Sequence, residues 1–207
     1  MLVVGLTGSI GMGKTAVAGH LAERGVAVLD SDRVVHSLYT GEAVAEIEAA
    51  FPGATAGGVV DRASLSTALL ADPGGFARLE SLIHPMVRRA QWRFLQEQEA
   101  KGASLAALDI PLLFETGGDA LMDVTIVVSA PAEIQAARVL ARPGMTPEKL
   151  EAIRARQLPD AEKRARADFI VDTGVSFEET RADVDRILES LDHQSGDAME
   201  RWRRMYA

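Results

Sequence analysis

The chain has 207 residues, of which 47% are hydrophobic, and it carries a formal net charge of −8. The length suits one compact α/β unit, and the negative charge disfavours nonspecific binding to nucleic acid or to an anionic membrane. The absence of cysteine excludes disulfides and thiolate metal sites, and the absence of asparagine excludes the Asn-Lys-x-Asp element of GTPases. No basic segment precedes the short first apolar run, so we expect a cytoplasmic protein without a leader or a membrane span.

A glycine-rich segment near the start carries the strongest motif of the chain. Its sequence GSIGMGKT has the phosphate-loop pattern of Gly, four residues, then Gly-Lys-Ser/Thr. Such a loop directs backbone N–H groups at phosphate oxygens, and the helix that follows adds its positive N-terminal end. An apolar run precedes it and a helical pattern follows, which is the order that the motif requires. We therefore predict a nucleotide site formed by Gly8, Ser9, Ile10, Gly11, Met12, Gly13, Lys14 and Thr15.

The chemistry of two residues in this loop defines their expected roles. Lys14 is expected to reach the β- and γ-phosphates as a positive charge. The Thr15 hydroxyl is expected to bind the Mg²⁺ that accompanies ATP. Mg²⁺ is the only metal that we predict, because the four histidines lie too far apart in the sequence for metal-ligand spacing.

The second predicted strand covers residues 25–29 and ends in the acidic sequence Asp-Ser-Asp. In a parallel sheet, ligands bind beyond the carboxyl ends of the strands. A carboxylate there, such as Asp32, could accept the proton of an acceptor hydroxyl. The alternative is that these acidic residues cap the helix that begins near Arg33.

Residues 33–102 are predicted to be mostly helical. They include a short amphipathic segment around Ile47, a loop at residues 52–58, and a helix that opens at residues 61–65. Pro85 is expected to break or restart a helix there, and a longer helix is expected over residues 86–101. This stretch exceeds a simple crossover, so we expect an inserted helical subdomain that binds the substrate.

The third predicted strand, residues 105–108, ends in Asp109. An acidic residue at the end of such a strand is what phosphate-loop enzymes need to orient Mg²⁺, directly or through water. Ile110 and Pro111 follow where motor ATPases usually place Glu, which disfavours a motor.

The next part of the chain predicts a buried strand followed by two helices that could form a lid. Residues 124–128 predict a buried strand, and Pro131 is well placed to start a helix that carries Arg138 and Arg142. A break at residues 143–148 precedes a second basic helix, and together they are typical of a lid whose arginines close over the transferring phosphoryl group. The alternative is a solvated face on which glutamates pair with these arginines.

The last predicted strand, residues 169–171, ends in a turn at residues 172–174. A final amphipathic helix is expected over residues 176–191. The tail, residues 193–207, is polar with a basic and aromatic end, and it could form a short added helix to which we assign no function.

In this order and spacing, the motifs resemble the dephospho-CoA kinase family over residues 2–191. The elements that carry the resemblance are LTGSIGMGKT, LDSD, LESLIHP, DIPLLFE, two arginines of the expected lid, and ADFIVDTG. The resemblance implies transfer of the γ-phosphoryl group of ATP to the ribose 3′-hydroxyl of dephospho-CoA, which completes coenzyme A. It also implies a small-molecule substrate, without a nucleic-acid or membrane partner; a protein partner is not predicted.

The resemblance also implies roles for particular residues. Asp32 would be the base or orienting group at the acceptor hydroxyl, and Lys14 and Arg142 would complete the catalytic set. Asp109 would lie near Mg²⁺ and substrate. The acceptor side would further include His84, Arg88, Leu112, Leu113 and Glu115, and the ATP side would include Arg138, Arg142, Asp172, Thr173 and Gly174. The family often has Asn at position 173, so an adenine contact by Thr173 is doubtful.

We therefore expect a P-loop kinase with a five-stranded parallel sheet flanked by helices. The core would comprise residues 1–32, 103–137 and 167–192, the helical insert residues 33–102, the lid residues 138–166, and the tail residues 193–207. Two rival functions remain open: a kinase for another small acceptor on the same fold, and an ATP-dependent regulatory module that holds a protein partner.

Overall fold

A computed structural model describes residues 1–207. The chain forms two compact units, one made of residues 1–29 and 97–207 and the other of residues 30–96. None of its helices, including the 26-residue α5, has the length and apolar character needed to cross a membrane.

The first unit is organised around a five-stranded sheet with the order β2-β5-β1-β6-β7. Strand β1 runs parallel to both of its neighbours, and β6 runs parallel to β7. Apolar residues fill both faces of the central strands, as is typical of parallel sheets covered by helices. The predicted five-stranded fold is therefore confirmed. The strands are β1 (Leu2–Thr7), β2 (Ala27–Asp30), β5 (Leu105–Asp109), β6 (Val124–Ser129) and β7 (Phe169–Asp172).

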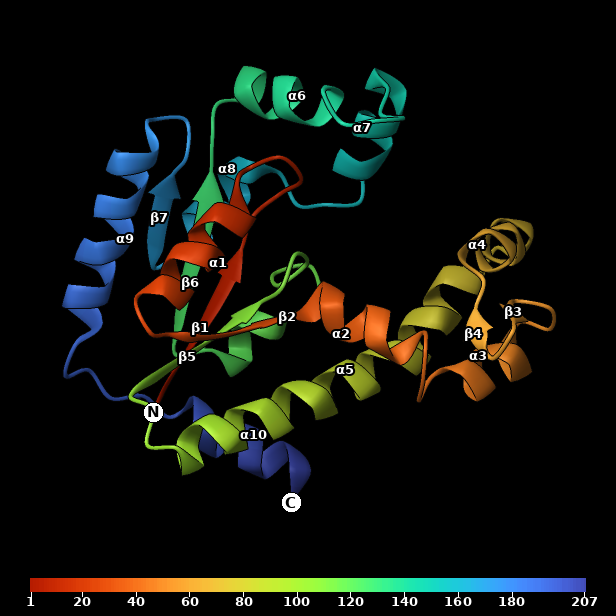
Figure 1. The fold of residues 1–207 in the computed structure, drawn as a ribbon, viewed down its shortest axis with the longest axis horizontal. Helices are drawn as coiled ribbons and strands as arrows, with labels where there is room; N and C mark the ends of the chain where they lie inside the picture. Colours follow the sequence, from red (N-terminus) through yellow and green to blue (C-terminus); the bar gives the residue numbers. More distant parts are fainter. The chain divides into compact units, whose positions relative to one another are not determined.

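Helices α1 (Lys14–Glu23) and α9 (Phe177–Leu191) pack against each other, and α9 also packs against β7 (Figure 1). The core between them and the sheet includes Val17, Leu21 and Val184. Helix α9 begins with a capping box, in which the side chains of Ser176 and Glu179 each bond the other's backbone N–H. The final helix of the prediction therefore starts one residue later than expected, because Ser176 is its cap.

Three short helices connect β6 to β7: α6 (Ala132–Leu140), α7 (Pro147–Arg154) and α8 (Asp160–Arg166). Figure 1 shows α6 and α7 beyond one end of the strands, on the side where the phosphate loop leaves β1. The sequence predicted two helices here. The third helix, α8, follows Pro159, whose fixed φ suits the position before a helix.

The tail forms helix α10 (Ala198–Tyr206), which contacts β1 and the 3₁₀ helix η1 (Gly118–Leu121). Trp202 is fully buried and its indole N–H donates to the carbonyl of Leu121 at 3.0 Å. The buried Asp123 carboxylate accepts from the backbone N–H groups of Val3 and Ala198 at 2.9 and 2.7 Å. One carboxylate thus ties the first strand to the last helix, so the tail belongs to the core of this unit.

The second unit has its own apolar core, which includes Leu38, Ile47, Leu65 and Ile83. Its elements are α2 (Ser31–Leu38), α3 (Val44–Ala50), β3 (Thr55–Ala56), β4 (Val59–Val60), α4 (Arg62–Ala71) and most of α5 (Gly75–Ala100). The segment predicted as a loop, residues 52–58, contains β3 and the turn of a small hairpin whose second strand, β4, follows directly. The Glu48 carboxylate holds this hairpin by accepting from the backbone N–H groups of Gly53 and Thr55. The glycines around it predicted an irregular loop, because the contact with Glu48 has no local sequence pattern.

The expected break at Pro85 is wrong, because α5 continues through it from Gly75 to Ala100. Proline removes one helical hydrogen bond and crowds the carbonyl four residues before it, which costs about 3 kcal/mol in a helix interior. Ile83 and Met86, on either side of Pro85, are both buried in the core of this unit. We infer that this packing offsets the local cost, so tertiary burial overrides the sequence signal.

Candidate active site

The phosphate loop connects β1 to α1 and turns through two left-handed glycines. Gly11 has φ 77° and Gly13 has φ 86°, a region that residues with a Cβ rarely adopt. Gly13 is also the N-cap of α1, and no side chain bonds the free N–H groups of the first helical turn there. These N–H groups and the positive end of the helix form a site suited to phosphate oxygens.

Close packing explains why glycine is needed at two further contacts of this loop. A Cβ at Gly8 would lie 2.6 Å from the carbonyl oxygen of Val128, and one at Gly13 would lie 2.9 Å from the Thr173 hydroxyl. The first neighbour is backbone and cannot move aside. The loop is therefore held between α1, the end of β6 and the turn after β7.

The ammonium group of Lys14 forms an ion pair with the carboxylate of Asp109. The two side chains are only 16% and 6% exposed. Asp109 is the last residue of β5, the neighbour of β1, so parallel pairing brings the strand end and the start of α1 together. Thr15 follows Lys14 and is exposed in the first turn. The structure thus gathers the lysine, the hydroxyl and the acidic residue that the sequence assigned to phosphate and Mg²⁺.

Thr173 supports the phosphate loop from the opposite side. Its hydroxyl donates to the carbonyl of Met12 at 2.7 Å, and Arg138 donates to the Thr173 hydroxyl and carbonyl at 3.0 and 2.7 Å. Thr173 is buried, and its side chain braces the loop. Asp172 instead accepts from the backbone N–H of Gly174 at 2.7 Å. Arg142 lies just beyond the end of α6 and is exposed.

The DIPLLFE segment at the end of β5 is tied to α8 and to the loop before it. Glu115 accepts from the Lys163 ammonium and from the backbone N–H of Leu158, both at 2.8 Å. Lys163 is fully buried and also donates to the carbonyl of Pro111 at 3.3 Å. The structure therefore gives Glu115 a bridging role that the sequence did not predict. Leu113, in the same segment, is fully buried.

We expect the variant Lys163→Met to lose about 3–5 kcal/mol of unfolding free energy, because it leaves the Glu115 carboxylate buried without its cation. Urea unfolding followed by circular dichroism measures this loss. The matched control is Lys101→Met at an exposed lysine, which should change stability by less than about 0.5 kcal/mol. Equal stability of the two variants would contradict the structural role of the pair.

In the second unit, Asp30 at the end of β2 and Asp32 in the first turn of α2 have different surroundings. The Asp30 carboxylate accepts from the backbone N–H groups of Asp32 and Arg33 at 2.9 and 3.1 Å, so Asp30 is the N-cap of α2. The capping alternative raised by the sequence thus holds for Asp30. Asp32 lies in the first turn of α2, where the carboxylate is not used as the cap. On α5, His84 and Arg88 are four residues apart and share one face of the helix.

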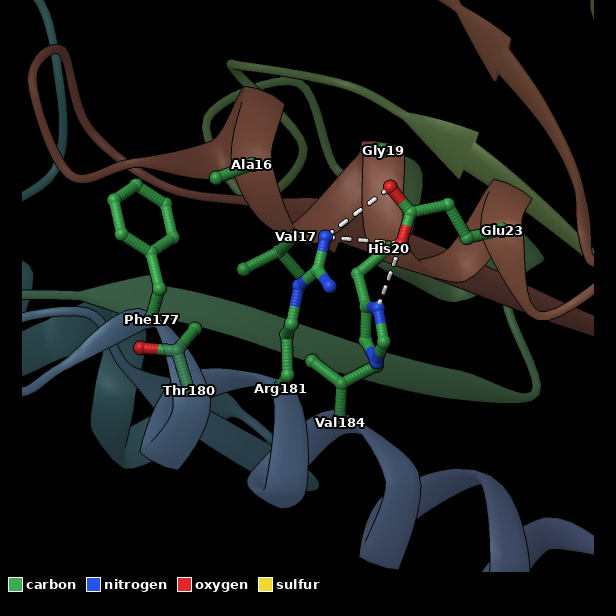
Figure 2. Close-up of a pocket in the computed structure, with 9 residues that line it drawn as sticks. All are labelled: Ala16, Val17, Gly19, His20, Glu23, Phe177, Thr180, Arg181 and Val184. Carbon is green, nitrogen blue, oxygen red and sulfur yellow. Dashed lines mark hydrogen bonds and ion pairs between the residues drawn. The ribbon is translucent and has the colours of Figure 1, made fainter.

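A separate pocket of about 220 Å³ lies between α1 and α9 (Figure 2). Arg181 of α9 reaches across it to the Glu23 carboxylate of α1, which also contacts His20 of the same helix, and Phe177 stands at its edge. Arg24 and His20 both hydrogen-bond to Asp185, and these contacts hold the pKa of that carboxyl below its usual value. No residue of the phosphate loop lines this pocket, so it is distinct from the phosphate site.

Two glutamines that no local sequence pattern marks as site residues also contact the phosphate loop. Gln135 of α6 donates to the Ile10 carbonyl at 2.8 Å, and Gln157 accepts from the Ile10 N–H at 3.2 Å. Gln135 is buried in the structure. A single glutamine in a helical pattern does not reveal from the sequence whether its side chain contacts a functional loop.

A phosphate loop after the first strand, paired through its lysine with the acidic end of the neighbouring strand and followed by basic helices, defines a P-loop kinase. A family model described as dephospho-CoA kinase matches residues 2–179. A dephospho-CoA kinase of Mesorhizobium japonicum is 56% identical over 196 residues, which cover 95% of this chain and 100% of that protein. The chain belongs to the dephospho-CoA kinase family.

Solved structures share the fold of this chain. A protein from Thermus thermophilus is 36% identical and superimposes with a TM-score of 0.80 over 94% of this chain and 98% of that one. A dephospho-CoA kinase from Campylobacter jejuni, at 22% identity, shares the fold with a TM-score of 0.70 over 91% of this chain and 96% of that one.

Proposed function

We propose that the protein transfers the γ-phosphoryl group of ATP to the ribose 3′-hydroxyl of dephospho-CoA, giving coenzyme A and ADP in the cytoplasm. The observation that carries the proposal is the phosphate loop with its Lys14–Asp109 ion pair, in a chain of the dephospho-CoA kinase family. In the reaction, the acceptor oxygen forms a bond to the γ-phosphorus as the bond to the β,γ-bridging oxygen breaks. The acceptor proton leaves to a base.

The residues of the first unit fit the ATP side of this reaction. The backbone N–H groups at the start of α1 would bind phosphate oxygens, and Lys14 would turn from Asp109 to the β- and γ-phosphates. The Thr15 hydroxyl and the Asp109 carboxylate are hard oxygen donors that suit Mg²⁺, which when bound neutralises phosphate charge. The chain has no cluster of three acidic, histidine or cysteine side chains that could hold a metal by itself. The remaining ligands would therefore be phosphate oxygens and water.

The acceptor side is assigned residue by residue from the family resemblance. Asp32 would take the proton of the 3′-hydroxyl or orient that hydroxyl. His84 and Arg88, on one face of α5, would bind dephospho-CoA, whose phosphates suit a guanidinium group. Leu112 and the Glu115 segment would line the same substrate, and Arg142 would close over the phosphoryl group from the lid. Asp172 and Gly174 would lie near the adenine of ATP.

Release of ADP from MgATP by the purified protein tests the function. We expect ADP to form only when dephospho-CoA is added, together with a product phosphorylated at the 3′ position. AMP and simple sugars are the control acceptors. ADP release that needs AMP or a sugar would favour the rival small-acceptor kinase, and ADP release that needs no acceptor would favour the regulatory module.

A further inference from the structure

The residue Ile10, in the middle of the phosphate loop, is held on both sides by glutamines of the segment that connects β6 to β7. Its carbonyl accepts from the Gln135 Nε2 at 2.8 Å, and its N–H donates to the Gln157 Oε1 at 3.2 Å. Gln135 belongs to α6 and Gln157 follows the end of α7. Both polar groups of this residue are thereby fixed by side chains more than a hundred positions away.

Gln135 also holds a lid arginine. Its Oε1 accepts from the Nε and Nη2 atoms of Arg154 at 3.1 and 2.6 Å. The side chain therefore uses its amide N–H for the phosphate loop and its oxygen for the lid, and Gln135 is only 4% exposed. A buried amide with both ends bonded is rigid and costly to replace, because any change leaves a polar partner unsatisfied.

The backbone around this amide is packed against the loop as well. A Cβ at Gly11 would lie 3.0 Å from the Gln135 carbonyl oxygen and 2.5 Å from Cγ2 of Val139. Helix α6 therefore contacts the loop directly, so a shift of α6 changes the positions of the N–H groups that face the phosphates.

We propose that Gln135 is a positioning residue that couples the phosphate loop to the lid. Through its amide N–H it sets the Ile10 carbonyl, and through its oxygen it orients the Arg154 guanidinium at the same time. Closure of the lid and the change of the loop to its phosphate-binding conformation therefore occur together. This inference rests on the proposed function only in that the loop binds the phosphates of ATP.

The test compares wild type with Gln135→Glu, Gln135→Met, Arg154→Met and the double variant Gln135→Met/Arg154→Met. Glutamate keeps the acceptor for Arg154 and loses the donor to Ile10, whereas methionine loses both. Calorimetric titration with ADP, which needs no acceptor substrate, should give affinities about 10-fold weaker in both Gln135 variants, the scale of one lost buried hydrogen bond. kcat/KM for ATP should fall by a similar factor, while the KM for dephospho-CoA stays unchanged.

Non-additivity is the second readout. Because Arg154 acts through Gln135, the double variant should lose no more than about 3-fold in kcat/KM beyond Gln135→Met. The matched control, Gln194→Glu at an exposed glutamine of the tail, should behave as wild type in every measurement. Circular dichroism melting reports any variant that fails to fold, and Gln157→Met then tests the N–H side of Ile10 with the same ADP titration.

The proposal is overturned if the folded variants bind ADP and turn over like wild type, or if Gln135 and Arg154 losses multiply independently. Failure of the proposed function looks different: wild type then shows no ADP release that depends on dephospho-CoA, while the ADP titrations still separate the variants.

Discussion

Turnover of the Asp32→Asn variant should fall roughly 10²- to 10⁴-fold, the usual scale for a general acid or base. Asparagine has the same shape as aspartate, but its amide cannot take the acceptor proton. ATP affinity should be nearly intact, because the phosphates are bound by the loop and not by Asp32. Initial rates at saturating dephospho-CoA, beside a nucleotide titration, measure the two effects separately.

Asp30→Asn is the matched control for this experiment. It removes a carboxylate two positions away, yet asparagine caps helices as well as aspartate does, so α2 keeps its cap. We expect this variant to retain most of the turnover. Equal activity of Asp32→Asn and wild type would remove Asp32 from the role of base, and equal losses in both variants would indicate that only the local charge matters.

Replacing Lys14 with alanine should weaken nucleotide binding and chemistry together. The ammonium group is expected to contact the phosphates in the ground state and to stabilise the charge that develops during transfer. Removal of one such preorganised charge costs on the order of 10²- to 10³-fold in kcat. A loss of about 10-fold in affinity for ADP should accompany it, because a charged hydrogen bond to phosphate is lost. Steady-state kinetics and calorimetric titration measure the two effects.

The control is Lys101→Ala, which removes an exposed lysine at the end of α5 and should change neither quantity. Lys14→Ala also leaves Asp109 without its cation, so the melting temperature must be measured beside the kinetics. Unchanged ADP binding by a folded Lys14→Ala protein would contradict the assignment of the loop as the phosphate site.

The sequence by itself determined the parts of this protein whose signal is local. The phosphate-loop motif predicts its own turn, because the glycines at fixed spacing allow the backbone conformation of the loop and the helix follows directly. Runs of apolar residues that alternate with helical patterns predicted the five strands in order, and the signal is clearest for the central strands, which are buried on both faces. Asp109, at the end of the third predicted strand, was singled out because phosphate-loop enzymes need an acidic residue at that place.

Only the tertiary structure decided which side chains meet across long stretches of sequence. Several buried contacts have no local sequence pattern, because neighbouring residues do not indicate a partner far along the chain. These contacts join Gln135 to Ile10, Glu115 to Lys163, and Asp123 to Val3 and Ala198. Pro85 shows the reverse case, in which a strong local signal lost to the burial of Ile83 and Met86. Local spacing specifies turns and elements because their energies depend on neighbours, whereas buried polar partners and tolerated prolines depend on packing that exists only once the chain has folded.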